Sequence, residues 1–156
     1  MHAAMLVTDR YGSADTADAA ALSGTLAMLI AQQMAQRAIE LAKTHGVACV
    51  ALRNNSHWLR AGRYGLMMAD AGMMGICMTN TCMNLVAYGA KEPSTGNNPI
   101  TFAIPRRAGS LVMDMAVSQY AYGKLEIMAQ EGKMLDAECG YDIDGNLTND
   151  ENSDFT

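Results

Sequence analysis

The segment from 23 to 52 constrains the fold most, because a helical pattern passes into an apolar run across a single glycine. The apolar residues of its first part recur at helical spacing: Leu26, Leu29, Ile30, Met34, Ala38 and Leu41. Lys43 and His45, followed by Gly46, are typical of a helix C-terminus. We therefore expect an amphipathic helix that ends at Gly46 and a buried strand over 47–52.

A second, shorter helix is expected after the polar stretch that follows this strand. Its apolar face would be formed by Tyr64, Leu66, Met67, Met68 and Ala71. Gly72 would end it, and Gly62 and Gly65 would leave room for another backbone to approach closely. A third helix is expected from a Ser118 cap to about Gln130.

Three further strands are expected, over residues 74–79, 100–104 and 110–116. The last two are joined only by the short turn RRAG, so we expect an α+β or mixed α/β fold rather than a doubly wound sheet. Residues 84–99 form a long irregular loop of the kind that usually has a function. Residues 1–22 show no clear period and receive no assignment, 23–150 form the domain, and 151–156 are a tail.

The composition predicts one folded domain, because 156 residues suit a single core and half of them are hydrophobic. The net charge is -5 and the eleven basic residues form no stripe, which argues against nucleic acid as a partner. No stretch reaches the roughly 18 apolar residues of a membrane span, and the N-terminus has no signal-peptide pattern. We expect a soluble, cytoplasmic protein with no membrane partner.

The sulfur-containing residues predict packing rather than chemistry. Cys49, Cys77, Cys82 and Cys139 have no C-x-x-C spacing, so we expect buried, reduced thiols. The fourteen methionines are expected to fill the core, because no copper-type clustering with Cys or His is present.

Several common site motifs are absent from the sequence. It contains no G-x-G-x-x-G, no G-x-x-x-x-G-K-[ST], no H-E-x-x-H and no G-x-S-x-G. Asp142, Asp144, Gly145 and Glu151 match part of a calcium-binding loop, but Gly140 occupies its first ligand position. A D-G hairpin turn is the better interpretation, and no metal site is expected.

His57 is the first candidate for chemistry. The polar residues 54–56 could orient it, Trp58 could form a stacking wall, and Arg60 and Arg63 could hold an anion. This mix suits a site where an anionic substrate accepts a proton. A lone histidine at a strand end is nevertheless more often structural, so the residues alone leave both interpretations open.

Asp114 is the second candidate, because it interrupts an otherwise apolar strand. A buried carboxylate needs partners, so it would either accept hydrogen bonds from backbone amides or contact a polar ligand. Exposure on the open face of a half-buried strand is an equally good alternative.

Five blocks in a fixed order carry a family resemblance: ALRNNSHWLRAGRYG, GICMTNT, AYGAKEPSTGNNPITFAIP, VMDMA and YGKLEIMAQEGK. Together they resemble the malate/L-lactate dehydrogenase family, NAD(P)-dependent oxidoreductases that lack the Rossmann fold. The H-W-x-R-x-G-x-Y-G pattern, with YGAKE and DGNLT, is most similar to the 2,3-diketo-L-gulonate reductase branch. The resemblance implies an incomplete NAD(P)-binding domain of the mixed α/β type.

The resemblance also implies a reaction: hydride transfer between NADH or NADPH and a 2-oxo or 2-hydroxy acid, such as the sugar acid 2,3-diketo-L-gulonate. His57 matches the family histidine beside the nicotinamide, and Thr81 and Arg60 fall at substrate-binding positions. The matched cofactor-binding strand comprises Ser110, Leu111, Val112, Met113, Asp114, Met115 and Ala116. A homodimer is implied as well.

The differences between this sequence and the family pattern predict that the chain is a central fragment of such an enzyme. Family members carry an earlier segment with Ser-His-Gly and an Arg, and a later one with a Trp-Lys contact. Here Thr44-His45-Gly46 matches an ordinary helix end instead. The alternative is a catalytically inactive remnant that acts as an interaction or assembly module.

Overall fold

The computed structural model describes residues 2–10, 17–55, 57–90, 92–136, 138, 140–141 and 146–149. The chain divides into two compact units. The first, which we call the sheet unit, comprises Met1–Asn80 and Asn98–Met115. The second, the loop unit, comprises Thr81–Asn97 and Ala116–Thr156. Each unit is described separately.

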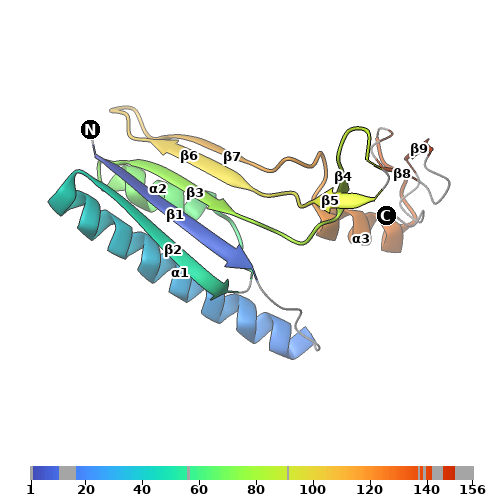
Figure 1. Cartoon of the computed structure of the whole chain (residues 1–156), viewed down its shortest axis with the longest axis horizontal. Helices are drawn as coiled ribbons and strands as arrows, with labels where there is room; N and C mark the ends of the chain where they lie inside the picture. Colours follow the sequence, from blue (N-terminus) through green and yellow to red (C-terminus); the bar gives the residue numbers. More distant parts are fainter. Residues whose placement is uncertain are drawn as a thin grey trace. The chain divides into compact units, whose positions relative to one another are not determined.

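The sheet unit is built on a five-stranded mixed sheet (Figure 1). Across the sheet the strands are β2 (Val47–Asn55), β1 (Ala3–Arg10), β3 (Met74–Thr79), β6 (Ile100–Ile104) and β7 (Leu111–Met115). β1 runs parallel to both β2 and β3, whereas β3 with β6 and β6 with β7 are antiparallel. The expected mixed α/β fold is confirmed, and so are the strands over 74–79 and 100–104.

Two helices cover one face of this sheet (Figure 1). α1 (Ala17–His45) packs on β1 and β2, and α2 (Gly62–Asp70) packs on β3, β6 and β7. α1 ends as predicted: Lys43 and His45 lie in its last turn, and Gly46 has a left-handed φ of 85°. Gly72, with φ 79°, follows α2 in the same way.

The buried face of α1 differs from the predicted one. A stripe of small residues faces the sheet: Ala27, Ala31, Ala35, Ala38 and Ala42, each at most 2% exposed. The predicted core residues Leu26, Leu29 and Ile30 are 51%, 47% and 40% exposed. That part of the prediction was wrong, because alanines let the helix approach the sheet closely and leave the large side chains outside.

β1 and β2 were the strands least well predicted. β1 lies between β2 and β3, although residues 1–22 had no expected structure. β2 is an edge strand whose side chains alternate between exposed and half-buried, so the prediction of a buried strand was wrong.

The two faces of the sheet differ in whether helices cover them. The residues beneath the helices include Ala4, Leu6, Gly75, Cys77, Thr101 and Ala103, all buried. The strand registers assign the alternate residues to the other face, which we call the open face. Its members are Ala3, Met5, Val47, Cys49, Ala51, Met74, Ile76, Met78, Ile100, Phe102, Ile104, Leu111, Met113 and Met115.

The methionines do not behave as core residues in general. Met68 and Met73 are buried, but Met83 and Met134 in the loop unit are 69% and 54% exposed. The prediction that methionine fills the core was therefore correct only in part.

Close approach of α2 to the sheet depends on glycines. A Cβ on Gly65 would lie 3.0 Å from Thr101 Cγ2 and 3.1 Å from Ala103 Cβ. A Cβ on Gly62 would lie 2.6 Å from Asp114 Oδ2. The prediction that Gly62 and Gly65 permit close approach is confirmed.

The loop unit contains short elements only. They are β4 (Leu85–Val86), β5 (Pro93–Thr95), α3 (Tyr122–Glu131), β8 (Gly140–Tyr141) and β9 (Leu147–Thr148). β4 and β5 pair within the expected irregular loop, and β8 and β9 pair as an antiparallel hairpin. The tested calcium pattern, Asp142, Asp144, Gly145 and Glu151, lies outside the described residues.

Ser118 does not cap α3. The N-cap position is Ala121, which makes no side-chain cap hydrogen bond, and the buried Ser118 Oγ has no partner in the described part of the chain. The helix starts at Tyr122, so the prediction placed its beginning too early.

Three cysteines can be compared with the prediction, and Cys139 lies outside the described residues. All three are free thiols, but only Cys77 is buried, whereas Cys49 and Cys82 are exposed. Burial and, to a smaller extent, the Asp114 charge raise the pKa of the Cys77 thiol to about 12. In the described residues no helix has the length and apolar character to cross a membrane, and no cluster of His, Cys, Asp and Glu could hold a metal.

We expect Gly75→Ala to destabilise the sheet unit. The new Cβ would lie 2.9 Å from Met68 Cβ and 3.1 Å from the backbone oxygen of Gly65. Overpacking of this kind costs about 1–3 kcal/mol, more than the roughly 0.5–1 kcal/mol that replacing glycine gains. Urea denaturation should show the loss, while Gly123→Ala, with no atom within 4 Å, should leave stability unchanged or slightly higher. Equal effects of the two substitutions would contradict the packing described for Gly75.

The free energy of unfolding is expected to fall above pH 9 through Cys77. The unfolded thiol loses its proton near its ordinary pKa of 9.0, whereas the folded one keeps it until about 12. One pH unit above 9 the difference costs about 1.4 kcal/mol. Urea denaturation across this range should therefore show a steeper loss for the native sequence than for Cys77→Ala, and parallel curves would refute the prediction.

Candidate functional site

The segment 57–61, which we call the His57 loop, connects the end of β2 to α2 in an unusual backbone conformation. Leu59 has a φ of 64°, a left-handed value that is costly for a bulky residue, and Asn54 has a φ of 56°. The backbone N–H of Leu59 donates a hydrogen bond to His57 Nδ1 at 2.9 Å. In the neutral ring this bond places the proton on Nε2.

Trp58 and Tyr64 anchor this loop in the core. Both are buried, with ring centroids 5.7 Å apart. The Tyr64 hydroxyl donates a hydrogen bond of 2.7 Å to the Trp58 carbonyl oxygen. Burial raises the pKa of Tyr64, an effect larger than the opposing one of Arg63, so the hydroxyl remains a donor.

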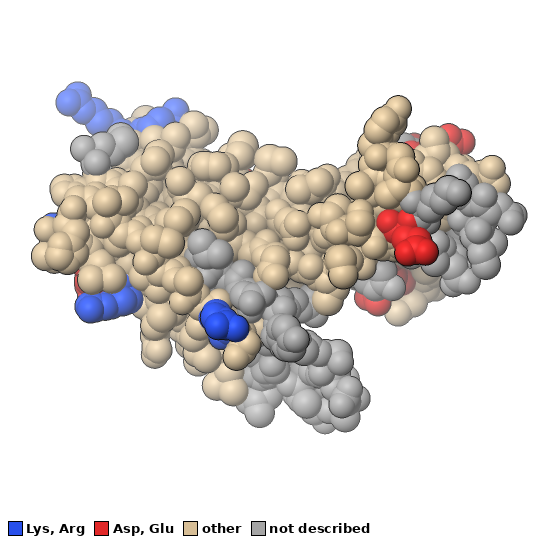
Figure 2. Space-filling model, viewed as in Figure 1, with Lys and Arg blue, Asp and Glu red and all other residues tan. Residues whose placement is uncertain are grey.

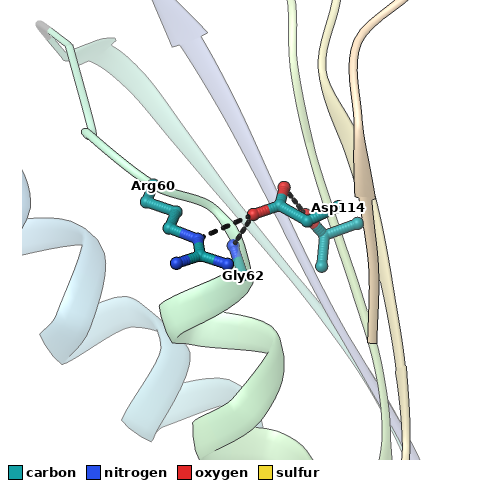
Figure 3. A network of polar contacts seen from close by, with 4 residues as sticks. Arg60, Gly62 and Asp114 are labelled. Atoms are coloured by element: carbon teal, nitrogen blue, oxygen red, sulfur yellow. Dashed lines mark hydrogen bonds and ion pairs between the residues drawn. The ribbon is translucent and has the colours of Figure 1, made fainter. Parts of the chain in front are cut away.

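The Asp114 carboxylate joins the His57 loop to the sheet (Figure 3). Its Oδ1 accepts a hydrogen bond from Thr101 Oγ1 at 2.7 Å. Its Oδ2 accepts one from the Gly62 backbone N–H at 3.0 Å and lies 3.4 Å from Arg60 Nε. Of the two interpretations offered by the sequence, a carboxylate bonded to a backbone amide is the one observed.

Asp114, which lies on β7, thereby caps the N-terminus of α2. Ala61, at the N-cap of α2, has no side chain that could bind the first amides. The positive end of the helix dipole and the Arg60 guanidinium both favour a carboxylate at this point. Because the Asp114 side chain is 21% exposed, the pair is partly screened from water.

Only one nitrogen of the Arg60 side chain makes a hydrogen bond within the described part of the chain. Its side chain is 83% exposed, and its single hydrogen bond is made by Nε. The terminal Nη atoms make no hydrogen bond in the described part of the chain and could bind a carboxylate or phosphate in the two-point manner typical of arginine.

A groove of about 620 Å³ lies beside the loop, between α1 and α2. Aromatic and apolar side chains form most of its wall, Arg60 and Arg63 add positive charge, and Asp70 adds a negative charge. Gly62 also lines it, so Asp114 contacts two residues of its wall. Arg63 Nη2 donates to Gln32 Oε1 at 3.4 Å, which connects α2 to α1 across the groove.

The structure brings together some of the predicted site residues, and others belong to the second unit. Arg60 and Asp114 are in contact, and His57 lies three residues before Arg60 in the same loop. Thr81 and Ala116 belong to the loop unit, where Thr81 packs against Gly96.

The predicted cofactor-binding strand divides between the two faces of the sheet. Ser110 precedes β7, and Val112 and Asp114 face α2. Leu111, Met113 and Met115 lie on the open face, opposite to Asp114.

Thr101 is the site residue that sequence analysis missed. It is fully buried in β6 and lies opposite Asp114 in the strand register. A threonine at an inward position of an apolar strand was the available signal, because a buried hydroxyl requires a partner.

Comparison with known proteins agrees with the resemblance found in the sequence. A family model described as malate/L-lactate dehydrogenase matches residues 1–154. Proteins described as 2,3-diketo-L-gulonate reductase from Haemophilus influenzae and Escherichia coli are 45% and 46% identical to this chain over 122 and 120 residues. These matches cover 78% and 77% of this chain and 36% of each relative.

Solved structures give the same result. The chain matches malate dehydrogenase from Entamoeba histolytica with a TM-score of 0.70 and 33% identity, over 77% of this chain and 34% of that one. Sulfolactate dehydrogenase from Methanocaldococcus jannaschii matches with a TM-score of 0.66 and 29% identity, over 78% and 36%. The chain thus spans about a third of the length of the relatives it matches, and it belongs to the malate/L-lactate dehydrogenase family.

Proposed function

We propose that the chain carries part of the active site of an oxidoreductase that transfers a hydride between NADH or NADPH and a 2-oxo or 2-hydroxy acid. The observation that carries the proposal is the His57 loop, which is fixed at both ends and in which Trp58, Leu59 and Arg60, the residues that follow His57, line a groove. Membership of a family described as malate/L-lactate dehydrogenase supports this reaction class.

His57 has the role of proton donor and acceptor in this proposal. Reduction of a 2-oxo acid adds a hydride to the carbonyl carbon and a proton to its oxygen. The Leu59 N–H bond to Nδ1 fixes the ring and leaves the transferable proton on Nε2. A histidine held in one tautomer can deliver that proton without reorienting.

Arg60 has the role of holding the substrate carboxylate. Asp114 binds its Nε, which orients the guanidinium and leaves the Nη pair for the acid. Because the Arg60 side chain is largely exposed, its pairing with Asp114 contributes little stability, and orientation is the more useful consequence.

The groove suits a nicotinamide cofactor. Its volume of about 620 Å³ lies in the usual range for small-molecule sites, Trp58 and Leu59 offer apolar contact to a flat ring, and Arg60 and Arg63 match anionic groups. The nicotinamide supplies the hydride when bound. The strand residues 110–116 would hold the cofactor through Val112 and the backbone, since the Asp114 carboxylate already binds Gly62 and Thr101.

For the substrate itself we propose a sugar-derived acid such as 2,3-diketo-L-gulonate. That compound is named in the descriptions of relatives that are 45% and 46% identical to this chain over 122 and 120 residues. Thr81 is proposed to contact the substrate, and the assembled enzyme is proposed to be a homodimer.

A second candidate is a non-catalytic interaction module. The apolar open face of the sheet favours it, because such a face is suited to association rather than to hydride transfer. Binding of the nucleotide distinguishes the two candidates.

NADH or NADPH is expected to quench the fluorescence of Trp58, the only tryptophan in the sequence, because Trp58 lines the groove. Arg60→Ala should then weaken binding of the 2-oxo acid about ten-fold or more, since hydrogen bonds to charged groups contribute about 1.5–3 kcal/mol. His57→Ala should lower kcat about 10²–10⁴-fold while nucleotide binding persists.

Matched controls exist for both substitutions. Arg37→Ala removes another exposed arginine with an acidic partner, and His45→Ala removes a histidine from the end of α1. Neither should alter quenching, binding of the acid or turnover. The proposal fails if neither nucleotide quenches Trp58, or if the control variants behave like Arg60→Ala and His57→Ala.

Asp114 is proposed to position the His57 loop, so removing its carboxylate should loosen the loop and α2 together. Asp114→Ala leaves the buried Thr101 hydroxyl and the Gly62 N–H without an acceptor, which costs about 1–3 kcal/mol. Asp114→Asn keeps an acceptor for the Gly62 N–H, so it should lower the free energy of unfolding by less than about 1 kcal/mol. Urea denaturation measures both.

The control is Asp70→Ala, which removes an exposed carboxylate from the other end of the same helix. It should not destabilise the protein, because a negative charge at a helix C-terminus is unfavourable. A loss of stability in Asp70→Ala as large as in Asp114→Ala would show that the capping contact has no special role.

A further inference from the structure

Binding of an acid by this chain depends on how single arginines are placed. The net charge is -5, and on the face drawn in Figure 2 the basic side chains of the described residues form small separate groups rather than a continuous patch. That face therefore offers no general positive field that would concentrate anions. The direction in which Arg60 presents its guanidinium consequently matters more than the total charge around it.

Arg60 does not set this direction by its own packing. Its side chain is 83% exposed, and within the described part of the chain its guanidinium is held by one contact, from Nε to Asp114 Oδ2 at 3.4 Å. The same oxygen accepts the Gly62 N–H at 3.0 Å (Figure 3). The orientation of Arg60 is therefore only as well defined as that of the Asp114 carboxylate.

Thr101 fixes the plane of that carboxylate. Its hydroxyl donates a hydrogen bond of 2.7 Å to Asp114 Oδ1, the oxygen that neither Gly62 nor Arg60 contacts. Rotation about the last side-chain bond of an aspartate meets only a broad, shallow torsional profile, so a single bonded oxygen would leave the group free to turn. With both oxygens bonded, Oδ2 stays between the Gly62 amide and the Arg60 guanidinium.

The Thr101 side chain is itself held in one orientation. It is fully buried, and its methyl group lies against α2, where a Cβ on Gly65 would be only 3.0 Å from Cγ2. The strand registers place Thr101 between Cys77 of β3 and Asp114 of β7. A β-branched residue has few χ1 rotamers, so a methyl group fixed against Gly65 also fixes the direction of the hydroxyl. The buried part of the sheet is thus connected to an exposed guanidinium through Thr101 and Asp114.

We propose that Thr101 is a positioning residue for binding of the acid: its hydroxyl orients Asp114, and Asp114 orients Arg60 toward the substrate carboxylate. This inference rests on the proposed function, in which Arg60 binds that carboxylate. His57 does not depend on the same contacts, because the Leu59 N–H holds its ring through a hydrogen bond of 2.9 Å. Loss of the Thr101 hydroxyl should therefore change KM for the acid much more than kcat.

The ¹H–¹⁵N signal of Arg60 Nε tests the positioning without any turnover. Asp114→Ala gives the position of this signal when the carboxylate is absent. Thr101→Val keeps the shape of the side chain but removes the hydroxyl, so the signal should move most of the way from its native position to that in Asp114→Ala. Thr101→Ser keeps the hydroxyl, and its signal should stay near the native position.

Steady-state kinetics with 2,3-diketo-L-gulonate and saturating NADH or NADPH test the consequence for the acid. Thr101→Val should raise KM about five- to ten-fold and change kcat less than about two-fold, because only the carboxylate clamp is misplaced. In an Arg60→Ala background the same substitution should have no further effect on KM, since the guanidinium that Thr101 orients is gone. A purely structural role for the hydroxyl would instead raise KM in both backgrounds.

Thr79→Val is the matched control. Thr79 is also buried and lies on the adjacent strand β3, but its hydroxyl donates to the Asn80 carbonyl oxygen rather than to Asp114. It should leave the Arg60 signal and KM unchanged. Thr101→Ala also removes the hydroxyl and takes the place of Thr101→Val if that variant does not fold.

Two results would overturn the proposal. One is an Arg60 Nε signal that stays at its native position in the variants without the Thr101 hydroxyl. The other is a rise in KM that persists undiminished in the Arg60→Ala background, or that Thr79→Val reproduces. If the native chain turns over no acid with either nucleotide, the proposed function fails, and the Arg60 signal alone decides whether Thr101 positions the guanidinium.

Discussion

The contact between the Asp114 carboxylate and the first amide of α2 is the interaction on which the site depends. β7 is an edge strand, and without this contact little but apolar packing would fix it to the start of α2. The same carboxylate binds the buried Thr101 hydroxyl and the Arg60 guanidinium, so one side chain fixes β6, β7, α2 and the His57 loop together. Gly62 is required for this arrangement, because a side chain there would occupy the position of the Asp114 oxygen. The start of α2 is therefore held by a residue 52 positions away in the chain.

Local sequence patterns predicted the elements whose formation depends on residues close together in the chain. The end of α1 at Gly46 and the strands β3 and β6 follow from a C-cap glycine and from short apolar runs between turn residues. β1 could not be predicted in this way, because its Met-Leu-Val-Thr run is stabilised by pairing with β2 and β3, which are distant in sequence. The prediction of which face of α1 is buried was wrong for a related reason. Periodicity identifies large apolar residues, whereas the sheet selected the alanines that allow a close approach.

The site was predicted as a set of residue types but not as a set of contacts. His57, Arg60 and Asp114 were all named from the sequence, and Arg60 and Asp114 do meet. The sequence could not show which of these residues positions which. Asp114 binds the chain's own amide, Arg60 is oriented by Asp114, and His57 is fixed by the backbone of Leu59 in a left-handed conformation. Thr101 escaped notice because a threonine in a strand is ordinary, and only the register with β7 places its hydroxyl against a carboxylate.

The period of two along β7 separates the two proposed roles of the sheet. Val112 and Asp114 face α2, whereas Leu111, Met113 and Met115 face the other way. Seven consecutive residues that resemblance assigns to one cofactor site thus cannot all present their side chains to it. Those that face away are exposed, as Val47 is at the other edge of the sheet. A substitution at Asp114 therefore alters the contacts of the His57 loop, whereas one at Met113 alters only the open face.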